Sequence, residues 1–157
     1  MQHRMKTHPL TQEQIEQLLV STQTGNLATI NMDGTPYVTP VHFLYFSNAV
    51  YIHGLPKGQK TNNIKLNNDV SMAIYQMDCL LFDPDGKPCD TNTKYQSVII
   101  QGKATLLEDT EQKKQILNGI VEKYTPQLSG SSLPDNMIRG TAVIKIDVLD
   151  ITGKYYD

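Results

Sequence analysis

The hydrophobic and polar positions of this chain follow a helical period in three segments. Thr11 and Gln14 have the spacing of a capping box, and the apolar residues after them recur on one helical face, which predicts a first helix ending near Thr22. Residues 59–66 predict a short second helix that asparagines terminate. Asp109 can cap a third, longer helix, which we expect to end at the next Thr-Pro pair.

Six further segments predict strands, because apolar and smaller or polar residues alternate within runs that turn residues separate. These segments are residues 27–32, 37–46, 49–53, 70–75, 95–107 and 141–151. Asp33-Gly34 is a strong short signal for a hairpin, and the fifth strand is expected to bend at Gly102. Residues 129–136 are predicted to be a polar connection.

Short connections decide the predicted architecture. Strands that follow each other through tight turns rather than through helices favour an antiparallel sheet. Closing such a sheet into a small barrel would remove its exposed edges. The pattern therefore predicts a mainly β fold of about six strands and three helices. Because the sequence has no internal repeat, low-complexity segment or linker, residues 1–157 are expected to form one domain.

Composition narrows the protein class. Hydrophobic residues are 39% of the 157 and charged residues 19%, which argues against disorder and against a membrane protein. Residues 1–6 lead into a polar helix rather than a signal-type apolar stretch, so we expect a cytoplasmic protein. The net charge of −2 gives no general attraction for nucleic acid. Cys79 and Cys89 lack the partners that a disulfide framework or a zinc site needs, and no metal site is expected.

The most informative stretch is residues 37–60, where two predicted strands lead into a lysine-bearing turn. The strands offer a ladder edge and apolar side chains to a flat ring. Gly58 permits close backbone approach, the helix after it presents free N–H groups, and Lys57 or Lys60 adds positive charge, which suits a phosphate monoester. The alternative is a solvated turn whose lysines keep it soluble.

Several familiar catalytic arrangements are missing from the sequence. The run Gly54-x-x-x-Gly58-x-Lys60-Thr61 departs from the P-loop spacing, and the chain lacks the strand–helix alternation of P-loop folds. No serine has a Gly-x-Ser-x-Gly context, and neither cysteine has a histidine nearby in the sequence. If the protein is an enzyme, its reactive group is therefore expected to belong to a bound cofactor.

Two histidines lie in the strands that lead to the lysine turn. A histidine in a strand is more commonly a half-buried packing residue than a reactant, and this interpretation applies to His42. His53 comes at the end of its strand, directly before the turn. Its imidazole is therefore placed to donate a hydrogen bond to a ligand of the turn, or to accept one from it.

Six short motifs occur in a fixed order over most of the chain. They are Leu27-Ala28-Thr29, Asp33-Gly34-x-Pro36-Tyr37-Val38-Thr39-Pro40-Val41, Tyr51-Ile52-His53-Gly54, Gly58-x-Lys60, Tyr95-x-Ser97-Val98-x-x-x-Gly102-x-Ala104 and Ile151-Thr152-Gly153-Lys154. This ordered set resembles the flavin-binding split-barrel family, the superfamily of pyridoxamine-phosphate oxidase. Within it, the set is most similar to the nitroimidazole-resistance (Nim-type) branch.

The resemblance implies a six-stranded antiparallel split β-barrel that forms a homodimer, with FMN, or alternatively FAD, in a cleft at the subunit interface. The residues that correspond to the ring-binding strands are Thr39, Pro40, Val41, His42, Phe43, Tyr51, Ile52 and His53. Those that correspond to the phosphate site are Lys57, Gly58, Lys60 and Asn63. A third group approaches the flavin from elsewhere, including from the other subunit, and consists of Tyr95, Ser97 and Lys154.

The resemblance also implies a reaction. His53 matches a histidine beside the flavin and substrate in the Nim-type branch, where reduced flavin would pass electrons to a small molecule such as a nitroimidazole or nitroaromatic. Two other functions remain open: a flavin carrier or redox sensor without turnover, and an enzyme like pyridoxamine-phosphate oxidase with another substrate. Haem or pyridoxal phosphate are further candidate ligands of the barrel. Because the sequence has no Gly-x-Gly-x-x-Gly fingerprint, it does not indicate an electron donor.

Overall fold

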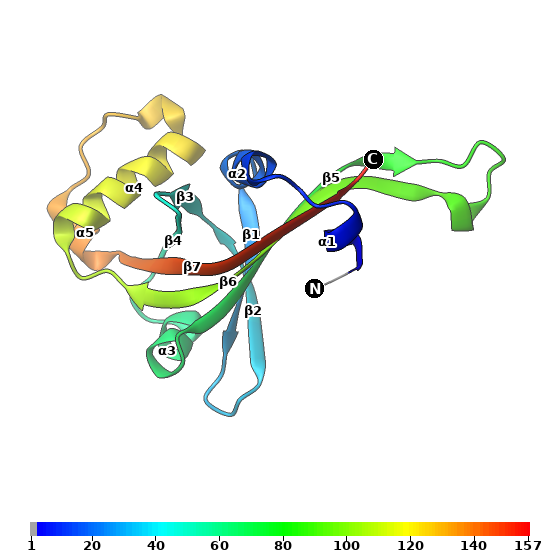
Figure 1. Cartoon of the computed structure of the whole chain (residues 1–157). Helices are drawn as coiled ribbons and strands as arrows, with labels where there is room; N and C mark the ends of the chain where they lie inside the picture. Colours follow the sequence, from blue (N-terminus) through cyan, green and yellow to red (C-terminus); the bar gives the residue numbers. More distant parts are fainter. Residues whose placement is uncertain (1–2) are drawn as a thin grey trace.

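The computed structural model describes residues 3–157, and its strands form one curled antiparallel sheet with helices around it (Figure 1). The strands are β1 (Thr24–Ile30), β2 (Pro36–His42), β3 (Leu44–Phe46), β4 (Ala49–Gly54), β5 (Asp69–Leu81), β6 (Asn92–Leu106) and β7 (Ala142–Tyr156). The helices are α1 (His3–Thr7), α2 (Gln12–Ser21), α3 (Gln59–Leu66), α4 (Thr110–Tyr124) and α5 (Asp135–Gly140), with short 3₁₀ turns η1 (Pro88–Asp90) and η2 (Pro126–Leu128). Met1 and Gln2 of the expected leading segment lie outside the described residues.

The predicted numbers of strands and helices are wrong. The described residues form seven strands and five α-helices, whereas the pattern predicts six and three. The predicted strand 37–46 is interrupted at Phe43, because the N–H of Phe43 donates to the Tyr124 hydroxyl at 2.8 Å instead of to a neighbouring strand. The two additional helices, α1 and α5, have five and six residues, which is too short for a helical period to be recognised.

The sheet is open. Its order is β2-β1-β5-β6-β7-β4-β3, so β2 and β3 are its two edges although they follow each other in the chain. Within residues 3–157 no ladder joins these edges. The strands therefore do not form a barrel closed by hydrogen bonds, and the predicted closure is wrong. The chain crosses from one edge to the other at Phe43, and β2 lies close to β4. We call the place where these strands face each other without a ladder, bordered by residues 38–42 and 52–54, the β2–β4 gap.

Two hydrophobic clusters support this arrangement. The inside of the curled sheet holds residues such as Val50, Ile52 and Ile100, and α2 seals it with Leu18 and Leu19. The predicted capping box of α2 is confirmed, because the Thr11 and Gln14 side chains each bond the other's backbone N–H. A second cluster lies between α4 and the outer side of β4 and β7, and consists of Ala49, Tyr51, Ile116, Ile120 and Val143.

The strands β5, β6 and β7 are longer than the pattern predicts. The β5–β6 hairpin extends beyond the rest of the sheet as a two-stranded ribbon (Figure 1). The expected bend at Gly102 is confirmed by a shift in the β6–β7 register between Gln101 and Gly102. A side chain at Gly102 would collide with the backbone oxygen of Asp147, so the bulge needs glycine. Among the described helices, none has both the length and the apolar character needed to cross a bilayer.

Candidate functional site

The free edge of β2 offers backbone hydrogen bonds to a flat ligand. Among the described residues β2 pairs with β1 alone, and an antiparallel ladder directs every second residue's backbone groups away from the partner strand. Pro36 and Pro40 fit these outward positions, since a proline there removes no ladder bond. The outward groups are therefore the N–H and C=O of Val38 and His42 and the C=O of Pro40, all along the β2–β4 gap.

The predicted ring-binding residues lie together along this gap, but most of their side chains point elsewhere. Val41, Phe43 and Ile52 are buried in the first cluster, with exposed fractions of 8%, 0% and 1%. Tyr51 is buried beneath α4. Thr39 is half-buried, and Pro40 and His42 are exposed. A ligand in the gap would therefore contact backbone at most of these positions and side chains mainly at Thr39, Pro40 and His42.

Three basic side chains from three elements gather around the end of β4. Burial is the main cause that lowers the pKa of His53 from its ordinary value of 6.5, and the charges of His42 and Lys60 act in the same direction. The Lys60 ammonium lies 3.4 Å from the position that a Cβ on Gly54 would occupy, so glycine there makes room for it. His53 is therefore kept neutral at pH 7 beside a cationic neighbour, which suits a site for an electron-rich ligand.

The predicted phosphate-binding turn has the expected local structure. α3 spans the predicted residues 59–66, and its first intrahelical bond runs from Asn62 N–H to Gly58 C=O at 3.0 Å. The N–H groups of residues 59–61 are therefore left for another acceptor. Lys57 and Gly58 are exposed in the turn, and no atom lies within 4 Å of a Cβ built on Gly58. An anion at this end of α3 would meet free N–H groups and the charges of Lys57 and Lys60.

Asn63 lies in the same helix but faces inward. Its side chain is 1% exposed, and its amide nitrogen donates to Thr29 Oγ1 at 3.0 Å and to Asn31 Oδ1 at 2.8 Å. Its amide oxygen accepts from Gln59 Nε2 at 3.0 Å. Asn63 thus fastens α3 to β1 and to the loop after it, and it positions the turn through these bonds.

The third predicted group lies far from the others along the sheet. On β7, Val143 is opposite His53, whereas Lys154 is opposite Ser97. Eleven residues of strand correspond to roughly 36 Å along β7. The Lys154 ammonium lies 5.8 Å from the centroid of the Tyr95 ring, and the Ser97 hydroxyl is buried without a hydrogen-bond partner among the described residues. One protomer therefore does not bring Tyr95, Ser97 and Lys154 to the β2–β4 gap.

Comparison with known proteins gives the family. A family model described as pyridoxamine 5'-phosphate oxidase matches residues 11–155. The chain belongs to this family. No curated protein sequence matches the chain.

Solved structures share the fold of this pyridoxamine 5'-phosphate oxidase family member. A proposed 5-nitroimidazole antibiotic resistance protein from Bacteroides thetaiotaomicron is 26% identical, with a TM-score of 0.82 over 94% of this chain and 86% of that one. The flavocytochrome Anf3 from Azotobacter vinelandii is 23% identical, with a TM-score of 0.80 over 94% and 68% of the two chains. An FAD and heme binding protein from Mycobacterium smegmatis is 14% identical, with a TM-score of 0.84 over 94% and 72%.

Tyr124 positions the backbone at Phe43, and the pattern of the sequence does not reveal this role. Its hydroxyl accepts from Phe43 N–H and lies 2.8 Å from the Phe43 carbonyl oxygen and 2.6 Å from that of Gln23. Its ring stacks on the His42 ring with the centroids 4.6 Å apart. The periodicity of α4 shows only an apolar face here, and a tyrosine in the last helical turn is the one signal that a polar contact is needed.

Lys123, the residue before Tyr124, also contacts Phe43 and in addition bonds to α2. Its ammonium donates to the Leu19 carbonyl oxygen at 3.0 Å, near the end of α2, and lies 4.0 Å from the centroid of the Phe43 ring. Burial lowers the pKa of Lys123 from 10.5 to about 8. The end of α4 therefore holds the end of α2 and the interruption between β2 and β3, and through them the edge of the gap.

Replacing Tyr124 by phenylalanine should lower the free energy of unfolding by about 2 kcal/mol, because the partly buried N–H of Phe43 loses its acceptor. The stacking surface toward His42 is retained, so the loss isolates the hydroxyl. Urea denaturation measures the change, and Tyr37→Phe, at a half-buried side chain outside the proposed site, is the matched control. Equal stability of Tyr124→Phe and the unchanged protein would contradict the role given to this hydroxyl.

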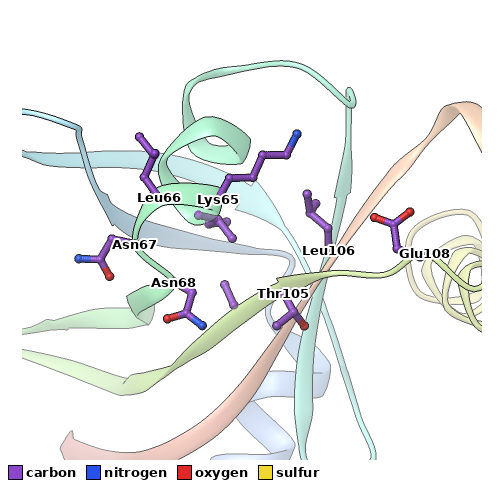
Figure 2. A pocket seen from close by; sticks show the side chains of 9 residues that line it. Lys65, Leu66, Asn67, Asn68, Thr105, Leu106 and Glu108 are labelled. Atoms are coloured by element: carbon purple, nitrogen blue, oxygen red, sulfur yellow. The ribbon is translucent and has the colours of Figure 1, made fainter.

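A large hollow also lies away from these groups. It measures about 610 Å³ and lies where the end of α3 faces β6 (Figure 2). Asn67 and Glu108 stand on opposite sides of it, and its polar side chains do not converge on one point (Figure 2). None of the predicted site residues lines it, so its size gives no support for a function.

Proposed function

We propose that this protein is an FMN-binding oxidoreductase that reduces a small organic molecule. The observation that carries the proposal is the position of the free β2 edge beside the cationic start of α3. The free β2 edge suits the polar edge of a planar ring, and the cationic start of α3 suits a phosphate. FMN carries both a planar ring and a phosphate in one molecule. The family match, and flavin-binding names among structures of the same fold, support flavin rather than another phosphorylated ring.

The residues of the gap fit this cofactor. The outward backbone groups of Val38, Pro40 and His42 would meet the polar edge of the ring system. Lys57, Lys60 and the first N–H groups of α3 would hold the phosphate. Since this turn would take a phosphate monoester, we propose FMN rather than FAD. Bound flavin would supply reversible uptake of electrons, and the chain's contribution is to bind and orient it.

His53 is proposed as the active-site side chain. It lies at the end of β4 beside Lys60 and His42, and its Nδ1 atom is buried without a partner among the described residues. A neutral imidazole carries one donor nitrogen and one acceptor nitrogen, and the tautomer decides which is which. It can therefore orient the molecule to be reduced or hold a proton for it. The likeness to the 5-nitroimidazole resistance protein supports a nitroimidazole or another nitroaromatic as that molecule.

A homodimer completes the proposed site. Tyr95, Ser97 and Lys154 lie far from the gap of their own protomer, so a second copy would bring them to the flavin. Tyr75 is opposite Ser97 on the neighbouring strand and 53% exposed, and Met77, opposite Tyr95, is 49% exposed. An uncovered sheet face with exposed apolar side chains beside these residues suits contact with another copy of the chain.

The absorption spectrum of freshly purified protein tests the cofactor. We expect flavin bands, and a mass spectrum of the molecule released on denaturation should give the mass of FMN. A colourless protein that gains no flavin bands when FMN is added would overturn the proposal. Anaerobic reduction followed by reoxidation with a nitroaromatic then tests turnover. A protein that binds FMN but is not reoxidised faster than free reduced FMN would be a flavin carrier or sensor instead.

A further inference from the structure

The β5–β6 hairpin presents apolar side chains to solvent where it leaves the sheet (Figure 1). Among the described residues, β7 ends opposite Tyr95 and β1 leaves β5 earlier, so residues 78–94 continue as two strands alone. We call this segment the ribbon. Its Leu80 and Phe82 side chains are exposed, Phe82 to 76%. Because a two-stranded hairpin is at most marginally stable in water, and exposed apolar side chains mark contact surfaces, the ribbon suits a surface that covers it.

The strand register sets where a second copy of the chain would lie. His53 is opposite Val143, whose carbonyl oxygen accepts from the Leu107 N–H, so His53 lies level with position 107 of the sheet. Tyr95 lies toward the other end of β6. A two-fold axis through the sheet face reverses the strand direction, and positions equally far from it then coincide in the two copies. Tyr95 of one copy therefore reaches the level of His53 in the other when the axis passes midway, at Gln101.

The sheet face at Gln101 is suited to such an axis. Gln101 points outward, since the side chain of the preceding Ile100 is packed inside the sheet. Ala28, Ile30 and Leu149 lie with Gln101 around an open hollow, and Leu149 is 68% exposed. An isologous contact places this patch on the same patch of the other copy, so these apolar side chains would cover one another.

With this axis, each ribbon ends beside α3 of the other copy. Asn92 lies level with position 110 of that copy, which is three residues or about 10 Å beyond its His53. β4 ends there and the chain continues into residues 55–67, whose helix α3 contacts β6. Leu55 and Leu66 are both exposed in this segment, Leu55 to 77%.

The charges of the two segments are complementary. The ribbon holds four aspartates and two lysines, which gives a net charge of −2. Residues 55–67 hold three lysines and no acidic residue, which gives a net charge of +3. Opposite charges steer two surfaces together and disfavour other arrangements, such as a contact of ribbon with ribbon.

We propose that the ribbon of one copy docks on residues 55–67 of a second copy, with Phe82 against Leu55 and Leu66, in a two-fold dimer. The inference rests on the proposed function, because the place of Tyr95 in the site sets the axis. The contact itself forms without flavin. Each copy then holds the α3 segment of the other, so the dimer contact and the proposed phosphate site support each other.

Cysteine crosslinking tests the contact in the full-length protein without FMN. Both cysteines of the chain, Cys79 and Cys89, are exposed in the ribbon. Leu55→Cys should therefore give a covalent dimer with a short bis-maleimide, whereas Leu128→Cys, at an exposed position after α4, should not. A covalent dimer of the unchanged protein, its absence in Leu55→Cys, or its persistence when both ribbon cysteines are replaced by serine would overturn the proposal.

Analytical ultracentrifugation measures the strength of the contact. Phe82→Asp removes two apolar contacts per dimer and should weaken dimerisation by about tenfold or more, while Leu128→Asp should stay within about twofold of the unchanged protein. Thermal unfolding confirms that each variant is folded, and undiminished dimerisation of folded Phe82→Asp would contradict the docking. Flavin bands without crosslinking would overturn this inference and leave the proposed function intact. Crosslinking without FMN binding would support the contact and refute the flavin function.

Discussion

Replacing Lys60 by alanine is expected to weaken FMN binding about 10- to 100-fold and to change riboflavin binding less than about twofold, because a charge-assisted hydrogen bond contributes about 1.5–3 kcal/mol. Riboflavin has the same ring system but no phosphate, so the comparison isolates the contact with the phosphate. Lys60 lies in the first turn of α3, beside the end of β4, where the helix leaves free N–H groups. Titration of the apoprotein, followed by the quenching of flavin fluorescence, measures both affinities.

Lys65→Ala is the matched control for this experiment. Lys65 is in the last turn of the same helix and is exposed, so its removal alters the net charge equally but leaves the proposed site intact. Its FMN affinity should stay within about twofold of the unchanged protein, since Lys65 is exposed at the other end of the helix and would not contact the phosphate. Equal losses for FMN and riboflavin in Lys60→Ala would mean that Lys60 does not touch the phosphate.

Replacing Asn63 by leucine should lower the free energy of unfolding by about 3 kcal/mol. The variant loses three hydrogen bonds, each worth about 1 kcal/mol, and leaves groups of Thr29, Asn31 and Gln59 with fewer partners. The packing volume is similar, so the effect reports the polar network. Urea denaturation gives the free energy, and FMN titration of the folded variant should also show weaker binding, because α3 is no longer fastened to β1.

The adjacent Asn62 supplies a control on the same helix. Asn62 is exposed, so Asn62→Leu should change stability by no more than about 0.5 kcal/mol. A loss of similar size in both variants would indicate a general effect of leucine on the helix. If Asn63→Leu kept its stability and lost only FMN binding, Asn63 would contact the phosphate directly, as the family resemblance implies, rather than position the turn.

Local chemistry made much of the fold predictable. The helices that begin after Thr11 and Asp109 are capped by these side chains, which accept hydrogen bonds from backbone N–H groups three residues later. The helix over residues 59–66 has no such cap, and the glycine before it and the asparagines after it mark its ends. The hairpin at Asp33-Gly34 has the same local origin, with Gly34 at a φ of 83°. The prediction of one strand over residues 37–46 is wrong because the Tyr124 hydroxyl accepts from the Phe43 N–H and interrupts the strand there. Tyr124 is 81 residues away from Phe43 in the chain, so no local pattern indicates this contact.

Parts of the candidate site were predictable for a similar reason. His53, Lys57, Gly58 and Lys60 are close in the chain, so a strand that runs into a helix brings them together. Asn63 differs, since its amide is turned toward β1, and only the packing of α3 decides this orientation. The separation of Tyr95 from the gap also depends on the strand register, which a single sequence does not specify.

The helix caps, the hairpin and the contiguous lysine turn follow from the sequence, because each depends on residues a few positions apart. It also carried the ordered motifs that the family model matches. Only the three-dimensional packing accounts for the open sheet between β2 and β3, for the Tyr124 contact that interrupts the strand at Phe43, and for the inward orientation of the Asn63 amide. These features join residues distant in the chain, and their geometry follows from packing and strand register rather than from local preference.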